Sequence, residues 1–124
     1  MKVLYVEDDP ASRKLIDKGL SAEGIEVVLA EDGPKAIELI KRVAFDALIL
    51  DIMMPGIDGL QVGKMARREA TNPDLPIVLL SAHPYALRES AAKRLKPVAS
   101  LTKPVKLERL VKVLKEAVPM AGKA

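Results

Sequence analysis

Two short runs of the sequence are apolar almost throughout, DALIL at 46–50 and PIVLL at 76–80. A strand with one solvated face alternates apolar and polar residues, whereas a central strand of a parallel sheet is covered on both faces and lacks that alternation. The two runs therefore predict central parallel strands. Because both faces of such a sheet need cover, helices are expected on each side of it.

Three further runs complete a prediction of five strands: KVLYVE at 2–7, IEVVLA at 25–30 and VASLT at 98–102. Apolar residues at helical spacing separate the strands, at about 10–22, from Gly33-Pro34 to Ala44, at 58–70, more weakly at 85–95, and at 105–118. This alternation favours right-handed crossovers and an open, mostly parallel α/β sheet flanked by five helices.

The size and composition are those of one compact domain. The 124 residues are 49% hydrophobic, and we predict a single domain over 1–124 with a short tail from about 119 to 124. The absence of cysteine excludes disulfides and thiolate metal sites. The opening MKVLYVEDDP resembles neither a signal peptide nor a membrane span, so we expect a soluble, cytoplasmic protein without membrane contact.

The charge pattern argues against direct binding of nucleic acid. Twenty basic and seventeen acidic residues give a net charge of +3, but the two signs are interspersed. Aromatic residues, on which bases stack, make up only 2% of the chain. No direct contact with nucleic acid is therefore expected.

Chemically active side chains stand at the predicted carboxyl ends of the strands, the edge where open α/β sheets bind ligands. They are Glu7, Asp8 and Asp9 after the first strand, Asp51 after the third, Ser81 after the fourth, and Thr102 and Lys103 at the end of the fifth. Carboxylates gathered at one edge repel one another, and a divalent cation removes that repulsion. Mg²⁺ is the expected ion, because softer metals prefer cysteine or histidine and the chain has one histidine.

These residue types suit phosphoryl transfer. A carboxylate such as Asp51 can attack phosphorus and form an aspartyl phosphate, provided that negative charge on the transferred group is neutralised. Mg²⁺ and Lys103 would supply that neutralisation, and Ser81 would donate a hydrogen bond to a phosphoryl oxygen.

Each residue also has an ordinary structural explanation. Asp9 before Pro10 has the pattern of a helix N-cap, and an acidic cluster before a helix often does no more than this. Ser81 alone is a common strand-end cap, and Lys103 before Pro104 is a common solvated charge. Their joint placement at one edge favours a functional site.

Four segments, in this order, resemble the receiver domain of bacterial response regulators: VLYVEDDP, DALILDIMMPGIDG, PIVLLSAH and LTKPV. The resemblance covers essentially the whole chain. It implies a flavodoxin-like fold with strand order 2-1-3-4-5 and Asp51 as phosphoacceptor. It further implies Mg²⁺ ligands from Asp51, Asp8, Glu7 through water and the backbone carbonyl of Met53, with Ser81 and Lys103 on the phosphoryl group.

The same resemblance implies a signalling switch of a two-component or phosphorelay system rather than a conventional enzyme, with some self-dephosphorylation. The phosphoryl donor would be a histidine kinase or a histidine phosphotransfer protein. An output protein or domain would be reached through the 85–118 face, and a phosphorylation-dependent dimer is a further option.

The sequence departs from the family pattern at two places. Ser100 stands where the family usually has an aromatic residue that turns inward on activation, and Lys96-Pro97 replaces a small Gly-Ala element before the fifth strand. His83 lies two residues beyond Ser81, where its ring either touches the water that attacks the phosphoryl group or is an inert loop side chain.

Two alternatives come from other classes of protein. A phosphatase of the haloacid dehalogenase type also uses an aspartate nucleophile with a hydroxyl and a lysine, but its D-x-D pattern is missing because Ile52 and Met53 follow Asp51. A non-phosphorylated pseudo-receiver that serves only for docking would normally lack the acidic pair, the acceptor or the lysine, and all are present here.

Overall fold

The computed structural model describes residues 1–54 and 56–118. Pro55, which the sequence places in a turn with Gly56, and the predicted tail at 119–124 lie outside these residues. The elements follow in the order β1 (Lys2–Val6), α1 (Pro10–Ala22), β2 (Glu26–Ala30), α2 (Gly33–Arg42), β3 (Ala47–Asp51), α3 (Gly59–Glu69), β4 (Ile77–Ser81), α4 (Pro84–Leu87), α5 (Ser90–Lys93), β5 (Ala99–Thr102) and α6 (Leu107–Ala117).

The five strands form one sheet in the order β2-β1-β3-β4-β5, and every pair of neighbours is parallel. This confirms the strand order that the family resemblance implied. All five residues of β3 and all five of β4 are buried, as the two apolar runs predicted for central strands. Their ends differ slightly, because Asp51 and Ser81 are the last residues of these strands rather than the first residues after them.

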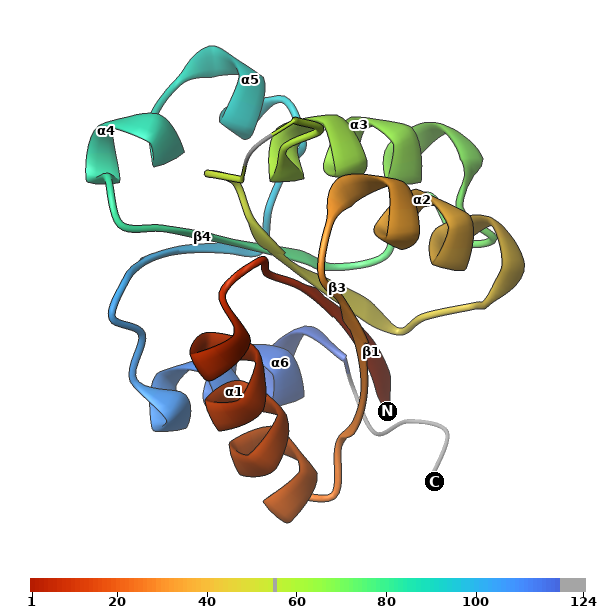
Figure 1. The fold of residues 1–124 in the computed structure, drawn as a ribbon. Coiled ribbons are helices and arrows are strands. Elements are labelled where there is room, and N and C mark those ends of the chain that lie inside the picture. The colour runs from red at the N-terminus through yellow and green to blue at the C-terminus, as the bar shows by residue number, and fades with distance from the viewer. Residues whose placement is uncertain (55, 119–124) are drawn as a thin grey trace.

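Helices cover both faces of the sheet, α2 and α3 on one side and α1 and α6 on the other (Figure 1). A hydrophobic cluster lies on each face. Alternate residues of β3 divide between them: Leu48 and Leu50 pack with α2, α3, α4 and α5, while Ala47 and Ile49 pack with α1 and α6. The period-2 geometry of a strand sends successive side chains to opposite faces, so an all-apolar strand supplies both cores at once.

Aspartates cap the starts of α1 and α3, and the cap of α1 is the one that the sequence predicted. Oδ2 of Asp9 accepts a hydrogen bond from the backbone nitrogen of Ser12 at 2.9 Å, so Asp9 is the N-cap of α1. This bond and one from the Ser12 hydroxyl lower the pKa of Asp9. Asp58 and Gln61 form a capping box that starts α3 at Gly59.

The single helix predicted over 85–95 is wrong, since the segment forms two helices of four residues each, α4 and α5. Ala86, Leu87, Ala92 and Leu95 are its buried apolar side chains. A continuous helix with Leu87 facing the core would also turn Ser90 and Ala91 inward and Ala92 away. Glu89 is instead extended, which breaks the helix and allows Ala92 to reach the core. The described chain therefore has six helices rather than five.

The departure at Lys96-Pro97 is visible in the backbone. Lys96 has a φ of +53°, in the left-handed region that favours glycine. Here the chain turns from the exit of α5 towards β5, with Val98 N donating to Ile77 O at 2.9 Å. The chain therefore passes from α5 to β5 without the small residue that the family usually has before the fifth strand.

Candidate functional site at the carboxyl edge of the sheet

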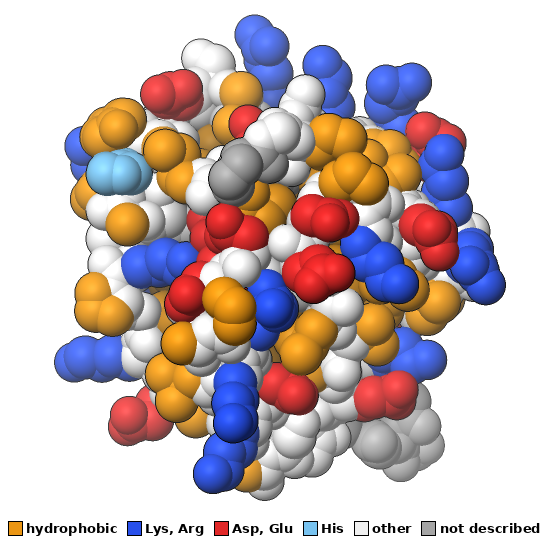
Figure 2. Space-filling view, viewed as in Figure 1, with side chains coloured by type: hydrophobic (Ala, Val, Ile, Leu, Met, Phe, Trp, Pro, Cys, Tyr) orange, Lys and Arg blue, Asp and Glu red, His pale blue; other side chains and the backbone are white. Residues whose placement is uncertain are grey.

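The parallel sheet brings the predicted side chains to one edge. Glu7 follows β1, Asp51 ends β3, Ser81 ends β4 and Lys103 follows β5. In the ladder Asp51 is opposite Leu80, and Ser81 is opposite Thr102, so neighbouring strands end at similar heights. Acidic side chains gather near the centre of the face seen in Figure 2.

The ammonium group of Lys103 joins two of the carboxylates. Its Nζ lies 2.6 Å from Oε1 of Glu7 and 2.9 Å from Oδ2 of Asp51. Both acids are buried, while the Lys103 side chain is 23% exposed. Burial alone would lower the pKa of Lys103, but the hydrogen bonds to Glu7 and Asp51 outweigh it and the pKa is raised. Lys103 therefore remains a cation at neutral pH.

Three carboxylates form a cluster with the geometry of a cation site. One oxygen each of Glu7, Asp8 and Asp51 lie within 4.8 Å of one another, with Asp8 exposed and the other two buried. Hard carboxylate oxygens that converge from one side, with one ligand open to solvent, suit Mg²⁺, which takes few protein ligands and keeps several waters. The residues present fit that ion.

Glu7 is held by partners that the sequence interpretation missed. The Tyr5 hydroxyl donates to Oε1 of Glu7 at 3.1 Å, and the backbone nitrogen of Asp9 donates to Oε2 at 3.2 Å. Burial raises the pKa of Glu7, the neighbouring Asp51 raises it further, and the bond from Lys103 opposes both. Burial and the nearby Glu7 also raise the pKa of Tyr5. The sequence did offer a signal for the bond from Tyr5: residues two apart on a strand point to the same side, and the hydroxyl of Tyr5 is therefore on the side of Glu7.

Asp51 and Ser81 are each tied to the backbone two residues later. The backbone nitrogen of Met53 donates to Oδ1 of Asp51, and that of His83 donates to Oγ of Ser81, both at 3.0 Å. These bonds fix both side chains at the strand ends. The ring of His83 packs against that of Tyr85, with centroids 5.4 Å apart.

The start of α3 closes tightly over the end of β3. A Cβ atom added to Gly59 would collide with the backbone carbonyl of Asp51 and lie 2.9 Å from Cα of Ile52. Backbone atoms cannot move aside as a flexible side chain can. Gly59 therefore allows the close approach that sets the height of Asp51.

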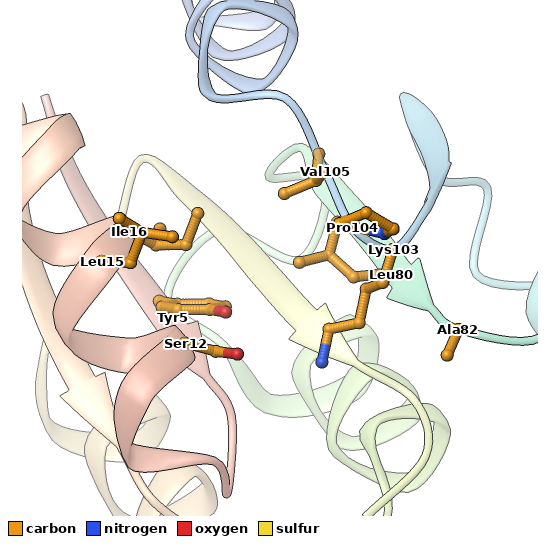
Figure 3. Close-up of a pocket in the computed structure, with 9 residues that line it drawn as sticks. All are labelled: Tyr5, Ser12, Leu15, Ile16, Leu80, Ala82, Lys103, Pro104 and Val105. Carbon is orange, nitrogen blue, oxygen red and sulfur yellow. The ribbon is translucent and has the colours of Figure 1, made fainter.

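A groove runs from Lys103 along α1. Its cavity volume is about 320 Å³, and one side is formed by β1 and α1, the other by the segment around Pro104 (Figure 3). Leu15 of α1 lines it and is 70% exposed. The groove thus places an apolar surface beside the polar site. The lining residues are Tyr5, Ser12, Leu15, Ile16, Leu80, Ala82, Lys103, Pro104 and Val105.

A parallel 2-1-3-4-5 sheet with acids and a lysine at its carboxyl edge defines a receiver-type module. The family model for the response regulator receiver domain matches residues 3–115. The chain therefore belongs to the response regulator receiver domain family of two-component systems, and not to the haloacid dehalogenase phosphatases.

Relatives in sequence are whole response regulators. The chain is 40% identical over 116 residues to the response regulator MprA of Mycobacterium leprae, covering 90% of this chain and 48% of that protein. It is also 40% identical over 116 residues to MprA of Mycobacterium ulcerans, covering 90% of this chain and 47% of the relative. The chain thus spans about half the length of the curated relatives it matches.

Solved structures share the fold and include metal-bound sites. The receiver domain of sensor histidine kinase PA1611 from Pseudomonas aeruginosa, with magnesium in the active site cleft, has a TM-score of 0.86 and 28% identity, covering 94% of this chain and 96% of that one. The response regulator TrrA of Thermotoga maritima, in complex with Mg²⁺ and BeF, has a TM-score of 0.84 and 30% identity, covering 94% and 97%.

No helix among residues 1–54 and 56–118 is long and apolar enough to cross a membrane. Ser100, at the position where the family usually has an aromatic residue, is exposed on β5 opposite Leu79 of β4. No aromatic side chain therefore stands at that position to turn inward.

Proposed function

We propose that this chain is a phosphoacceptor receiver in which Asp51 takes a phosphoryl group from a phosphohistidine donor. One carboxylate oxygen of Asp51 forms a bond to phosphorus while the bond between phosphorus and the donor imidazole nitrogen breaks. That nitrogen keeps the electron pair of the broken bond and then takes a proton. The observation that carries the proposal is the contact of the Lys103 ammonium with both Asp51 and Glu7 at the strand ends.

Lys103 and Ser81 would hold the transferred group. The Lys103 ammonium lies 2.9 Å from Oδ2 of Asp51. It would therefore stabilise negative charge on the carboxylate before the transfer and on the phosphoryl oxygens during it. The Ser81 oxygen already accepts the bond from His83 N, which leaves its hydroxyl hydrogen to donate to a phosphoryl oxygen. Modification of Asp51 would thereby draw Ser81 and its loop towards the site.

The side chains of Glu7, Asp8 and Asp51, with the backbone carbonyl of Met53, would hold Mg²⁺. When bound, Mg²⁺ supplies neutralisation of the negative charge on carboxylates and phosphoryl oxygens. The chain's own part is to fix these ligands: Tyr5 and the Asp9 backbone orient Glu7, and the Met53 backbone orients Asp51.

The phosphoryl donor would be a histidine kinase or a histidine phosphotransfer protein. An incoming histidine must approach Asp51 in line, so its protein has to dock beside Lys103, where Leu15 and the groove offer an apolar surface. The 85–118 face would pass the signal to an output protein or domain, or to a second copy in a phosphorylation-dependent dimer. Self-dephosphorylation and a cytoplasmic location complete the proposal.

The test uses acetyl phosphate with Mg²⁺ on the wild type and on Asp51→Asn, with the products read by intact mass. Wild type should gain the mass of one phosphoryl group and Asp51→Asn should not. Equal modification of both would show another acceptor. Failure of the folded wild type to react with acetyl phosphate, or to bind beryllofluoride in amide spectra, would favour the docking-only pseudo-receiver.

A further inference from the structure

A second cleft lies between α3 and α5, on the face of the sheet opposite α1 and α6. Its volume is about 450 Å³, and its apolar lining includes Leu60, Ala91 and Leu95. The two elements approach closely at one end, because a Cβ on Gly63 would lie 2.6 Å from Cδ1 of Leu95. The contact between Gly63 and Leu95 closes the bottom of the cleft, so the cleft is a surface groove that does not continue into the core.

The cleft is strongly basic. Four cationic side chains line it, Lys64, Arg67, Arg68 and Arg94, against the single carboxylate of Asp58. Among residues 1–54 and 56–118 none of the four forms an ion pair with an acid. Glu69, the residue after Arg68, forms an ion pair with Lys41 at 3.9 Å. Lys and Arg side chains project along the upper edge of Figure 2, over α3 and α5 in Figure 1.

Arg67 fixes the walls of the cleft without losing its charge. Its guanidinium donates to four backbone carbonyls, those of Pro73 at 2.7 Å, Leu75 at 2.6 Å, Leu95 at 2.8 Å and Lys96 at 3.4 Å. These bonds tie α3 to the loop before β4 and to the exit of α5. All four acceptors are neutral carbonyls, so the bonds do not neutralise the positive charge of Arg67.

The apolar bottom of the cleft and the cationic side chains at its rim together indicate which kind of ligand would bind there. An amphipathic peptide lays its apolar face into a hydrophobic groove, and acidic residues flanking that face would meet Lys64, Arg68 and Arg94. Nucleic acid would match the charge but not the floor, and none of the three aromatic residues of the chain lines the cleft to stack on a base.

We infer that the α3–α5 cleft is a docking site for an acidic amphipathic segment of a partner protein. The cleft shares no lining residue with the groove beside Lys103, so this docking is separate from phosphoryl transfer to Asp51. The side chains at its rim are exposed and therefore available to a partner without unfolding.

The probe is a synthetic fluorescent peptide of Glu and Leu in which leucines recur at three and four residue steps. A scrambled peptide of the same composition, without a continuous leucine face, controls for charge alone. Binding to the full chain is measured by fluorescence anisotropy, and the contact surface is mapped by amide shifts. The ordered peptide should bind more tightly than the scrambled one and shift amides of α3 and α5.

The matched variants are Arg94→Glu and Arg68→Glu in the cleft and Lys112→Glu on α6, which change the net charge equally. All three positions are exposed, and thermal unfolding checks that each variant folds. Each cleft variant should weaken binding by about ten-fold or more, because one attraction becomes a repulsion, whereas Lys112→Glu should not.

Three outcomes would overturn the inference. One is no binding of the ordered peptide at about 1 mM, the weak end of specific association. The second is equal weakening by Lys112→Glu, or amide shifts outside α3 and α5. The third is tighter binding of a single-stranded oligonucleotide at the same residues, which would make the cleft a nucleic-acid site. Because Asp51 does not line the cleft, Asp51→Asn should bind the peptide as tightly as the unphosphorylated wild type, which separates failure of this inference from failure of the proposed function.

Discussion

Nζ of Lys103 lies closer to Oε1 of Glu7, at 2.6 Å, than to Oδ2 of Asp51, at 2.9 Å. The ammonium therefore compensates a carboxylate of the cation cluster as well as the acceptor. A cation entering the cluster would compete with Lys103 for the carboxylates of Glu7 and Asp51. On the proposed function, we therefore expect Lys103 to oppose metal binding while it favours phosphoryl transfer.

Replacing Lys103 should separate these two effects. Lys103→Gln is expected to bind Mg²⁺ more tightly, because a competing positive charge is gone, and to be phosphorylated about a hundred-fold more slowly, because charge stabilisation at the phosphoryl oxygens is lost. The chain has no tryptophan, so Mg²⁺ binding is measured by calorimetry and phosphorylation by intact mass. Lys112→Gln, with the same charge change on α6, should match wild type. Weaker Mg²⁺ binding by Lys103→Gln would contradict the competition.

The raised pKa of Glu7 predicts how stability without metal depends on pH. In the pH range between its ordinary pKa of 4.5 and its raised pKa, the folded state binds more protons at Glu7 than the unfolded state does. Glu7 therefore contributes stability that is complete below pH 4.5 and lost as pH rises through the raised pKa. Unfolding midpoints with EDTA across pH, subtracted from those of Glu7→Gln, isolate this contribution.

The wild type should lose stability relative to Glu7→Gln as pH rises through that window, and Mg²⁺ should restore it in the wild type at neutral pH. A difference that stays flat with pH would show that the pKa of Glu7 is the same in the folded and unfolded states, which would contradict the raised pKa.

Gly59 should not tolerate a side chain. Gly59→Ala is expected to destabilise the fold by about 1–3 kcal/mol, because the new Cβ meets the Asp51 backbone, and to slow phosphorylation by moving the acceptor. Gly63→Ala is the matched control, since its Cβ meets the flexible Leu95 and Leu50 side chains and alanine favours the helix. Chemical denaturation of both variants gives the comparison. A smaller loss for Gly59→Ala than for Gly63→Ala would contradict the close approach.

His83 should have little influence on the lifetime of the aspartyl phosphate. Its ring packs against Tyr85, and only its backbone nitrogen is tied to Ser81. His83→Ala should therefore change the dephosphorylation rate less than Ser81→Ala does, as followed by the decay of the phosphorylated mass. A larger effect from His83→Ala would mean that the imidazole reaches the attacking water.

Much of the fold was predictable because it is written in local patterns. Runs without alternation of apolar and polar residues predicted β3 and β4. The Asp9-Pro10 pair predicted the start of α1, which begins at Pro10. The division of residues 84–93 into two helices was not predictable from periodicity. It depends on which apolar side chains find the core, a tertiary contact that a window of sequence does not contain.

The site divides in the same way. Placement of Glu7, Asp51, Ser81 and Lys103 at one edge follows from parallel topology alone. The hydrogen bond from Tyr5 to Glu7 depends on burial of the strand and on rotamers, so only proximity in sequence hinted at it. The positive charge of the α3–α5 cleft was also not predictable from local sequence, because its cations come from two segments far apart in the chain.

The break between α4 and α5 has a consequence for local stability. A helix of four residues is far too short to be stable on its own. Each of these two helices is therefore stabilised by the packing of its few buried side chains. Amide hydrogens at 84–95 should exchange with solvent through local opening at a small fraction of the free energy needed to expose β3 or β4. A partner could reshape this segment while the sheet that carries Asp51 stays folded.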